Sequence, residues 1–132
     1  MGFLDLLFKP RQQRFVVQLH HSKYPHYDFR LEIDGKLRSW AIPKEPSMEP
    51  GVRRLAIRVE DHPVSFINFS GTIPEGQYGA GIVMIWDKGH YELLQRERGK
   101  LKFRLIGDKL SGEYVLYRMK GKGKNWLLMK MR

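Results

Sequence analysis

Four side chains near the N-terminus have the types and the spacing that metal-dependent chemistry needs. His26, Asp28 and Arg30 alternate along one short segment, and His20 lies six positions before His26. Alternate residues of an extended strand point to the same face, so an imidazole, a carboxylate and a guanidinium would lie within about 7 Å of their neighbours. A preceding strand that ends at His20 can add a second imidazole to this face.

The donor atoms of this set favour particular metals. Two imidazoles and one carboxylate suit Mn, Fe or Zn and suit Ca or Mg poorly, and three protein ligands leave positions for water or substrate. Arg30 could hold a phosphate oxygen beside the metal, because guanidinium donors match phosphate geometry. We therefore predict a catalytic metal site at His20, His26 and Asp28. The spacing alone leaves open that these residues merely coat a solvated strand.

A second polar cluster lies between residues 53 and 63. Arg54, Arg58, Glu60 and His62 share a parity, which predicts one polar strand face. His62 precedes Pro63 at the expected strand end, where it could donate a proton to a leaving oxygen or hydrogen-bond a phosphoryl oxygen. The position alone is also compatible with an ordinary surface histidine at a turn.

The elements that must position these residues are mostly β-strands. Hydrophobic alternation predicts strands at Phe15–His20 and Tyr27–Ile33, and Asp34-Gly35 then forms a tight turn into a strand at Lys36–Ile42. Further strands are predicted at Leu55–Glu60, Val64–Phe69, Gly81–Trp86, His90–Leu94, Lys100–Ile106, Gly112–Met119 and Trp126–Met131.

Short strands separated by glycine, proline and aspartate predict a small closed or nearly closed β-barrel with little helix. Helix is expected only at Leu4–Phe8 and, as a turn, near Pro74–Gly76. The glycine-rich run Thr72–Gly81 lacks the Lys-Ser/Thr end of a P-loop, so we interpret it as a tight loop between strands. We expect an N-terminal arm over residues 1–13 and one barrel domain over residues 14–132.

The composition excludes cysteine-based chemistry and membrane-spanning helices. The 132 residues include no cysteine, which excludes disulfides, thiolate zinc sites and cysteine nucleophiles. No apolar run approaches the roughly 20 residues that span a bilayer, and the start Met1–Phe8 is too short and too acidic for a signal peptide. We therefore expect a cytoplasmic protein without membrane contact.

The net charge of +10 is concentrated near the C-terminus. Residues 1–95 carry 12 Lys and Arg against 11 Asp and Glu, a net of +1, whereas residues 96–132 carry 12 against 3, a net of +9. Lys100, Lys102 and Arg104 share one face of a predicted strand. Such a surface attracts polyanions through counterion release, so we expect residues 96–132 to contact a nucleic-acid backbone.

Several segments of this sequence, taken in order, resemble one family: the 3′-phosphoesterase domain of multifunctional bacterial DNA repair ligases of the non-homologous end-joining type, and its stand-alone relatives. The resemblance runs from Arg14 to the C-terminus. Each segment alone is weakly specific, but the ordered set is highly specific. The segments are Phe15–His20, His26–Glu32, Ser39–Lys44, Val59–Pro63, Ile73–Gly81 and Trp126–Lys130.

The resemblance implies a β-barrel that depends on Mn²⁺, with other divalent transition metals as alternatives. It implies removal of a 3′-terminal ribonucleoside and then of the remaining 3′-phosphate, which leaves a 3′-hydroxyl. DNA or RNA–DNA 3′ ends would be the substrates, and a DNA ligase and a polymerase of the same repair pathway would be partners. By motif position, His20, His26 and Asp28 would be the metal ligands.

The resemblance also assigns residues around the metal. Arg30 and Arg54 would bind the scissile phosphate. His62 would contact the phosphate from the other side, as an acid or a transition-state stabiliser. Lys44 and Glu60 would support these groups.

The sequence departs from the family pattern in two places, one of which is the arm before the first strand, where residues 1–13 do not match the Arg-Asp-containing arm of the family. The family places a tyrosine four positions after His62, where this sequence has Phe66, which lacks a hydroxyl. This second departure predicts that the phosphomonoesterase step is weaker than the phosphodiesterase step.

Two other functions are alternatives. A non-catalytic nucleic-acid-binding barrel predicts binding without turnover at any metal concentration, and the intact set of metal ligands argues against it. An iron oxygenase also uses two histidines and a carboxylate. Oxygenase chemistry, however, gives no role to Arg30, Arg54 or the basic C-terminal segment.

Overall fold

The structure is a computed structural model that describes residues 13–132, and this range contains nine strands and one 3₁₀ helix. The predicted helix at Leu4–Phe8 and all but the last residue of the predicted arm lie outside the described residues. Within residues 13–132, no helix is long and apolar enough to cross a membrane. The elements are β1 (Gln13–His21), β2 (His26–Ile33), β3 (Lys36–Ile42), β4 (Arg53–Pro63), η1 (Val64–Asn68), β5 (Gly71–Ile73), β6 (Gly81–Glu97), β7 (Lys100–Gly107), β8 (Ser111–Arg118) and β9 (Asn125–Lys130).

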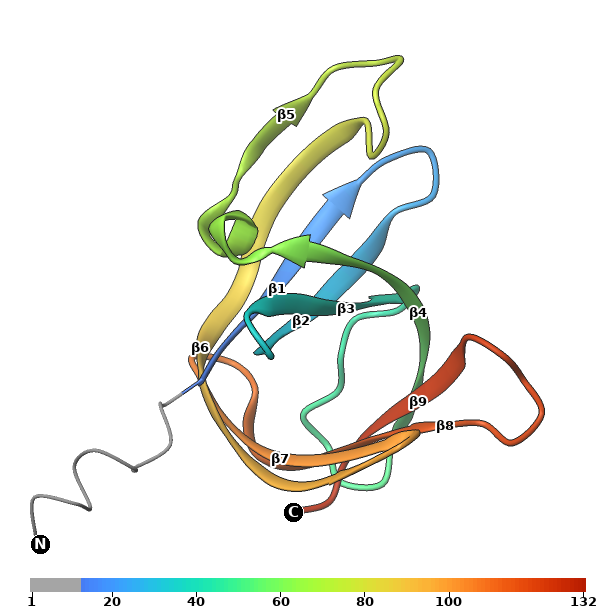
Figure 1. Ribbon diagram of the computed structural model, residues 1–132. Helices are drawn as coiled ribbons and strands as arrows, with labels where there is room; N and C mark the ends of the chain where they lie inside the picture. The colour runs from blue at the N-terminus through green and yellow to red at the C-terminus, as the bar shows by residue number, and fades with distance from the viewer. Residues whose placement is uncertain (1–12) are drawn as a thin grey trace, which may run out of the picture.

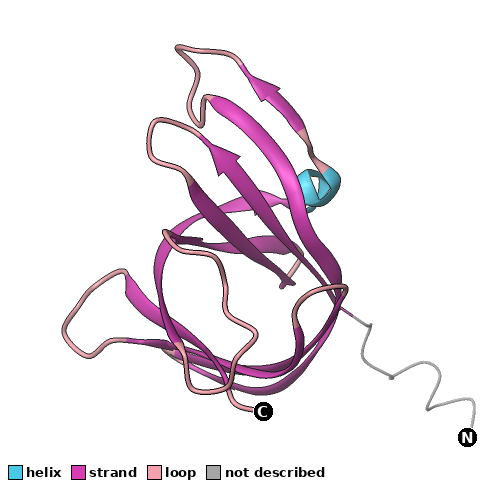
Figure 2. Ribbon diagram, turned by 180° about the vertical axis from the view of Figure 1, so that it is seen from behind, coloured by secondary structure: helices cyan, strands magenta, loops and turns pink. Residues whose placement is uncertain are grey.

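Eight strands close into an antiparallel barrel, which confirms the predicted fold. They follow the order β1-β2-β3-β4-β9-β8-β7-β6, the pairing of β1 with β6 closes the ring, and β5 lies outside it on the edge of β6 (Figure 1). Figure 2 shows the same ring from behind. Inward-facing aromatic side chains fill the interior. Phe29 stacks on Phe103 with ring centroids 5.9 Å apart, and Trp40 meets Trp126 edge to face at 5.5 Å.

Strand β6 is longer than predicted. It is continuous from Gly81 to Glu97, so the expected break between Trp86 and His90 is wrong. Gly89 permits a close approach of strands rather than a turn, because a Cβ atom there would lie 2.0 Å from the Ile106 carbonyl oxygen of β7. The first residues of β6, Gly81–Val83, pair with β5, and the rest of the strand continues into the barrel (Figure 1).

The segment after β4 is helical, so the predicted strand at Val64–Phe69 is also wrong. Pro63 ends β4, since it has no N–H for the ladder, and the next five residues form η1. Ile67 of η1 packs with Val16 and Leu37, which lie on the outer face of the barrel. As a result, η1 covers the outer face of β1 and β3 instead of extending the sheet.

A loop and the short strand β5 complete this cover. Residues 74–80 connect β5 to β6 through two turns, in which the Gln77 N–H donates to the Pro74 carbonyl (3.3 Å) and the Ala80 N–H donates to the Gln77 carbonyl (3.1 Å). The glycine-rich run is thus a tight loop, as predicted, and contains no helix. Together η1, β5 and this loop enclose a pocket against outward-facing side chains of β1 and β2.

Candidate functional site

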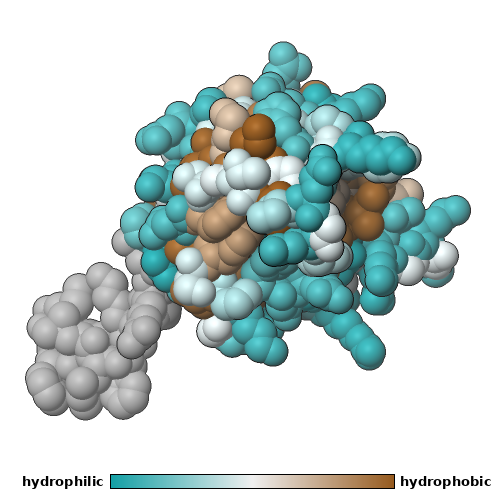
Figure 3. Space-filling model, turned by 90° about the horizontal axis from the view of Figure 1, so that it is seen from above, coloured by the Kyte–Doolittle hydropathy of each residue, from teal (hydrophilic) through white to brown (hydrophobic). Residues whose placement is uncertain are grey.

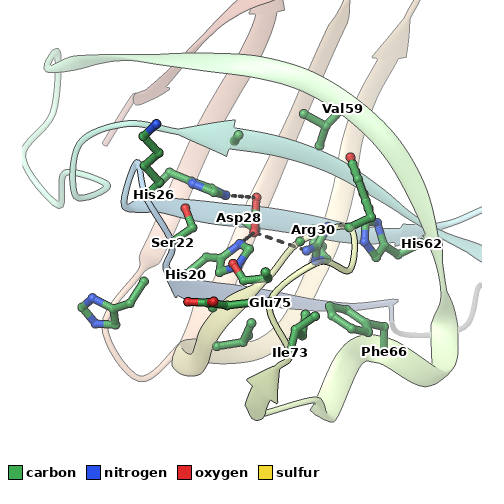
Figure 4. Close-up of a pocket in the computed structure, with 18 residues that line it drawn as sticks. His20, Ser22, His26, Asp28, Arg30, Val59, His62, Phe66, Ile73 and Glu75 are labelled. Carbon is green, nitrogen blue, oxygen red and sulfur yellow. Dashed lines mark hydrogen bonds and ion pairs between the residues drawn. The ribbon is translucent and has the colours of Figure 1, made fainter.

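The pocket collects polar side chains on the outer face of the barrel. Val17 lies in the barrel core, so the alternation of β1 turns Gln18 and His20 outward. Asp28 and Arg30 of β2 point into the same space (Figure 4). His20, Asp28 and Arg30 are only 7%, 6% and 4% exposed. They are therefore buried groups rather than the surface of a solvated strand.

Three side chains converge in the geometry of a metal site. His20 Nδ1 lies 3.6 Å from Asp28 Oδ2, and His26 Nε2 lies 3.2 Å from Asp28 Oδ1. One possible ligand atom from each residue lies within 4.8 Å of the other two. A nitrogen–nitrogen–oxygen set of this size fits a divalent transition metal.

The remaining nitrogen of each imidazole is held by a backbone carbonyl. His26 Nδ1 lies 2.9 Å from the Tyr24 oxygen, and His20 Nε2 lies 3.3 Å from the Ala80 oxygen. A nitrogen that faces a carbonyl carries the proton, which leaves the lone pair of the other nitrogen free for a metal. The loops on both sides of the pocket therefore set the tautomers that metal binding needs.

In the metal-free protein, we expect the pKa of His26 to lie above its ordinary value. The hydrogen bond to Asp28 is the main cause, and it outweighs the opposing effect of burial. Because the folded-state pKa is raised, this contact stabilises the metal-free fold below the unfolded-state pKa, and the contribution is lost as pH rises through the folded pKa. Protons and metal compete for the same nitrogen, so metal affinity should fall as pH decreases through this pKa.

An NMR titration of the imidazole signals checks this prediction. The Asp28→Asn variant should bring the pKa of His26 down towards its ordinary value. An unchanged His26 titration in that variant would show that the carboxylate is not the cause.

Arg30 is fixed by a network of buried partners. Its Nε donates to Gln18 Oε1 (2.7 Å), its Nη1 donates to Ser39 Oγ (2.9 Å), and its Nη2 lies 3.4 Å from Asp28 Oδ2. Burial lowers the pKa of Arg30 and the Asp28 carboxylate raises it, and the guanidinium remains charged at any physiological pH. Gln18 in turn donates to the Phe66 and Phe69 carbonyls, both at 3.1 Å, and so ties Arg30 to η1.

His62 reaches the pocket at the end of β4. Its Nδ1 lies 3.2 Å from Arg30 Nη1 and 3.1 Å from the Glu60 carbonyl oxygen. Burial and the Arg30 charge lower the pKa of His62. Nδ1 therefore faces both a donor, the Arg30 guanidinium, and an acceptor, the Glu60 carbonyl oxygen, while Nε2 has neither of these partners.

His62 faces the pocket because of a β-bulge in β4, and not because of the regular alternation of strand residues. Leu37 pairs with His62 but Ser39 pairs with Val59, so two residues of β4 stand opposite Arg38. The extra residue reverses the alternation after Val59. The predicted shared face of Arg54, Arg58, Glu60 and His62 is therefore wrong, although His62 itself lies in the pocket.

Three residues assigned by resemblance do not line the pocket. The Arg54 Nε donates instead to the Glu45 carbonyl at 2.7 Å. Lys44 and Glu60 are exposed, and Glu60 contributes its backbone oxygen to His62. Their roles in phosphate binding and support stay predictions.

The structure also adds residues that sequence reasoning missed. Gln18 and Ser39 hold Arg30, while Glu75 and Tyr78 line the pocket from the covering loop. Gln18 could have been identified from the sequence, because it is a polar residue inside an apolar strand and shares the parity of His20. Glu75 and Tyr78 could not have been identified in this way, because their position depends on how β5 and β6 fold.

The pocket walls combine these charges with apolar surface. Val59, Phe66 and Ile73 stand around the polar centre (Figure 4). Seen from above, the molecule shows apolar surface in the middle of this face and hydrophilic side chains around it (Figure 3). Apolar walls reduce dielectric screening, so each charged contact inside the pocket is strengthened.

The chain is similar in sequence to a known family of protein domains. The family model described as the DNA ligase D 3′-phosphoesterase domain matches residues 18–118. The multifunctional non-homologous end joining protein LigD of Pseudomonas aeruginosa is 47% identical over 136 residues, which cover 94% of this chain and 16% of that protein.

Two further relatives show the same pattern. The multifunctional non-homologous end joining DNA repair protein LigD of Mycobacterium tuberculosis is 45% identical over 122 residues, covering 89% of this chain and 16% of that protein. The corresponding Mycolicibacterium smegmatis protein is 42% identical over 130 residues, covering 90% and 17%. The chain thus spans about a sixth of the length of these relatives.

Proposed function

Because the chain belongs to the DNA ligase D 3′-phosphoesterase domain family, we propose that it is a Mn²⁺-dependent hydrolase that removes a 3′-terminal ribonucleoside and then the remaining 3′-phosphate. One observation carries the proposal: the donor set of His20, His26 and Asp28 adjoins the buried guanidinium of Arg30. A guanidinium beside metal ligands suits a substrate that is itself a phosphate. The product is a 3′-hydroxyl, so we propose a polymerase and a DNA ligase of the end-joining pathway as partners.

In the first step, removal of the terminal ribonucleoside, each residue of the pocket has its own role. Water attacks phosphorus, and the bond to the 5′ oxygen of the terminal nucleoside breaks. A cation bound by the three ligands would supply Lewis-acid stabilisation of negative charge on the phosphoryl oxygens. Arg30 binds a non-bridging oxygen without reorganising, because Gln18 and Ser39 already hold it. His62 gives a proton to the leaving 5′ oxygen.

A 5′-labelled DNA strand that ends in one ribonucleotide tests this function. With Mn²⁺ we expect two successive products, a strand with a 3′-phosphate and then the same strand with a 3′-hydroxyl. Chelator should abolish both products, and Mg²⁺ should support less turnover because the donor set suits it poorly. Binding of the strand without product at any metal concentration would instead identify a non-catalytic nucleic-acid-binding barrel.

A further inference from the structure

A second basic site lies on the other face of β3. Arg38 and Ser39 are neighbours in that strand, so they point to opposite faces, and Ser39 faces Arg30 of the metal pocket. Arg38 opens into a groove between the β6–β7 turn and the β8–β9 loop, which projects from the barrel away from β5 (Figure 1). Two adjoining hollows make up this groove. They share Arg98, Gly99 and Arg118, and Arg38 lines one of them while Lys120 lines the other.

Most cations of this groove have no counter-ion. Among the described residues, Arg98, Arg118 and Lys120 form no ion pair, and the one acidic residue of the lining, Glu97, accepts a hydrogen bond from Gln95. Arg104 on β7 is different, because it is paired with Glu92 at 3.0 Å and with Glu113 at 3.2 Å. The basic C-terminal segment therefore contains both neutralised and unneutralised cations.

Arg38 is placed at the inner end of the groove by aromatic packing. Its guanidinium carbon lies 5.5 Å from the Trp40 ring centroid and 5.8 Å from that of Trp126. Burial, and then the nearby charges of Arg58 and Arg96, lower its pKa, whereas Asp61 and Asp34 raise it. Arg58 and Arg96 are themselves paired with Asp61 and Asp34, whereas Arg38 has no ion pair among the described residues.

The outer end of the groove depends on a glycine. Gly99 has a φ of +90°, a left-handed conformation that favours glycine. The Arg118 N–H donates to the Gly99 carbonyl at 2.8 Å, so the two segments are joined through the backbone. Arg118 is thereby held across the β6–β7 turn, with Arg98 beside it in the same lining.

We propose that this groove binds the phosphodiester backbone of the nucleic-acid strand at a distance from the 3′ end. Unpaired cations extend from Arg38 through Arg98 and Arg118 to Lys120, which matches successive phosphates better than one small anion. Binding to phosphates gives affinity without reading sequence. The proposal rests on the proposed function only in taking nucleic acid as the substrate.

Binding of a fluorescent DNA strand in the presence of chelator tests the groove without turnover. The Arg98→Ala/Arg118→Ala/Lys120→Ala variant should bind at least about tenfold more weakly at moderate salt, and its salt dependence should flatten by roughly 0.7 for each phosphate that it no longer neutralises. Lys88→Ala is the control, because Lys88 is an exposed cation outside the lining of the groove, and it should bind like the parent. Melting temperatures and the single variant Arg118→Ala separate a direct effect on binding from a loss of folding.

Parent-like affinity and salt slope in the triple variant would overturn the proposal. In turnover assays, the triple variant should show a raised KM on a long ribonucleotide-ended strand and an unchanged kcat/KM on a dinucleotide too short to reach the groove. If the parent binds through the groove but hydrolyses neither substrate, the proposed function fails while the groove stands. If the parent hydrolyses both and the variant matches it, the groove fails while the function stands.

Discussion

Replacing Asp28 with alanine should lower the rate of 3′-end hydrolysis by more than about a hundredfold, which corresponds to at least about 2.7 kcal/mol of barrier. Asp28 is the shared member of the proposed ligand set, since it lies 3.6 Å from His20 and 3.2 Å from His26. It also lies 3.4 Å from Arg30, so its loss affects the ligands and the phosphate-binding group together. Steady-state kinetics on a ribonucleotide-ended strand measure the effect.

Controls must separate chemistry from folding in this experiment. Loss of Asp28 leaves the buried Arg30 charge without its carboxylate, which destabilises the fold. Asp28→Asn keeps the shape, and its melting temperature shows whether the protein remains folded. Glu49→Ala removes an exposed acid outside the pocket and should leave the rate unchanged. Near-normal activity in a folded Asp28→Ala protein would rule out the assignment.

The second large effect concerns Phe66. We expect the protein to remove a terminal ribonucleoside readily and the remaining 3′-phosphate slowly. A phosphomonoester carries an additional negative oxygen, and its stabilisation calls for an additional hydrogen-bond donor. The Phe66 ring is centred 4.9 Å from the His62 ring and 5.1 Å from the Arg30 guanidinium carbon, but it has no donor to offer.

Phe66→Tyr should therefore raise the second rate more than the first. A single donor of this type is worth about 2.7–4 kcal/mol, or a hundred- to thousandfold in rate. His62→Ala should depress both rates, because the proposed proton donor serves both leaving oxygens. Separate kinetics on ribonucleotide-ended and 3′-phosphate-ended strands in Mn²⁺ give the comparison. Equal, fast rates on both strands in the parent protein would show that another group supplies the donor.

Much of the candidate metal site follows from strand period alone. The alternation around Phe29 correctly places Asp28 and Arg30 on one face, and the pairing of His20 with His26 aligns the two strands. The closed barrel likewise follows from short alternating strands with polar turns. The alternation depends only on residues near one another in sequence, whereas closure of the barrel also needs the pairing of β1 with β6.

The remaining features depend on residues that are distant in sequence. The bulge opposite Arg38 shifts the alternation of side chains along β4. The sequence spacing of Arg54 and His62 therefore could not predict which face each of them occupies. The apolar run after Pro63 resembles a strand, but Ile67 packs on the outer barrel face, which favours η1. The polar face of β2 is buried by elements more than 30 residues away, which no local pattern indicates.

Mn²⁺ binding by the purified protein, without nucleic acid, decides whether the pocket is a metal centre. Calorimetry and electron paramagnetic resonance should show one Mn²⁺ per chain, with affinity that weakens as pH falls. The His20→Ala/His26→Ala/Asp28→Ala variant should lose this binding, whereas Arg54→Ala, which alters a residue outside the pocket lining, should retain it. Stoichiometric binding of unchanged affinity in the triple variant would contradict the assignment of the metal to this pocket.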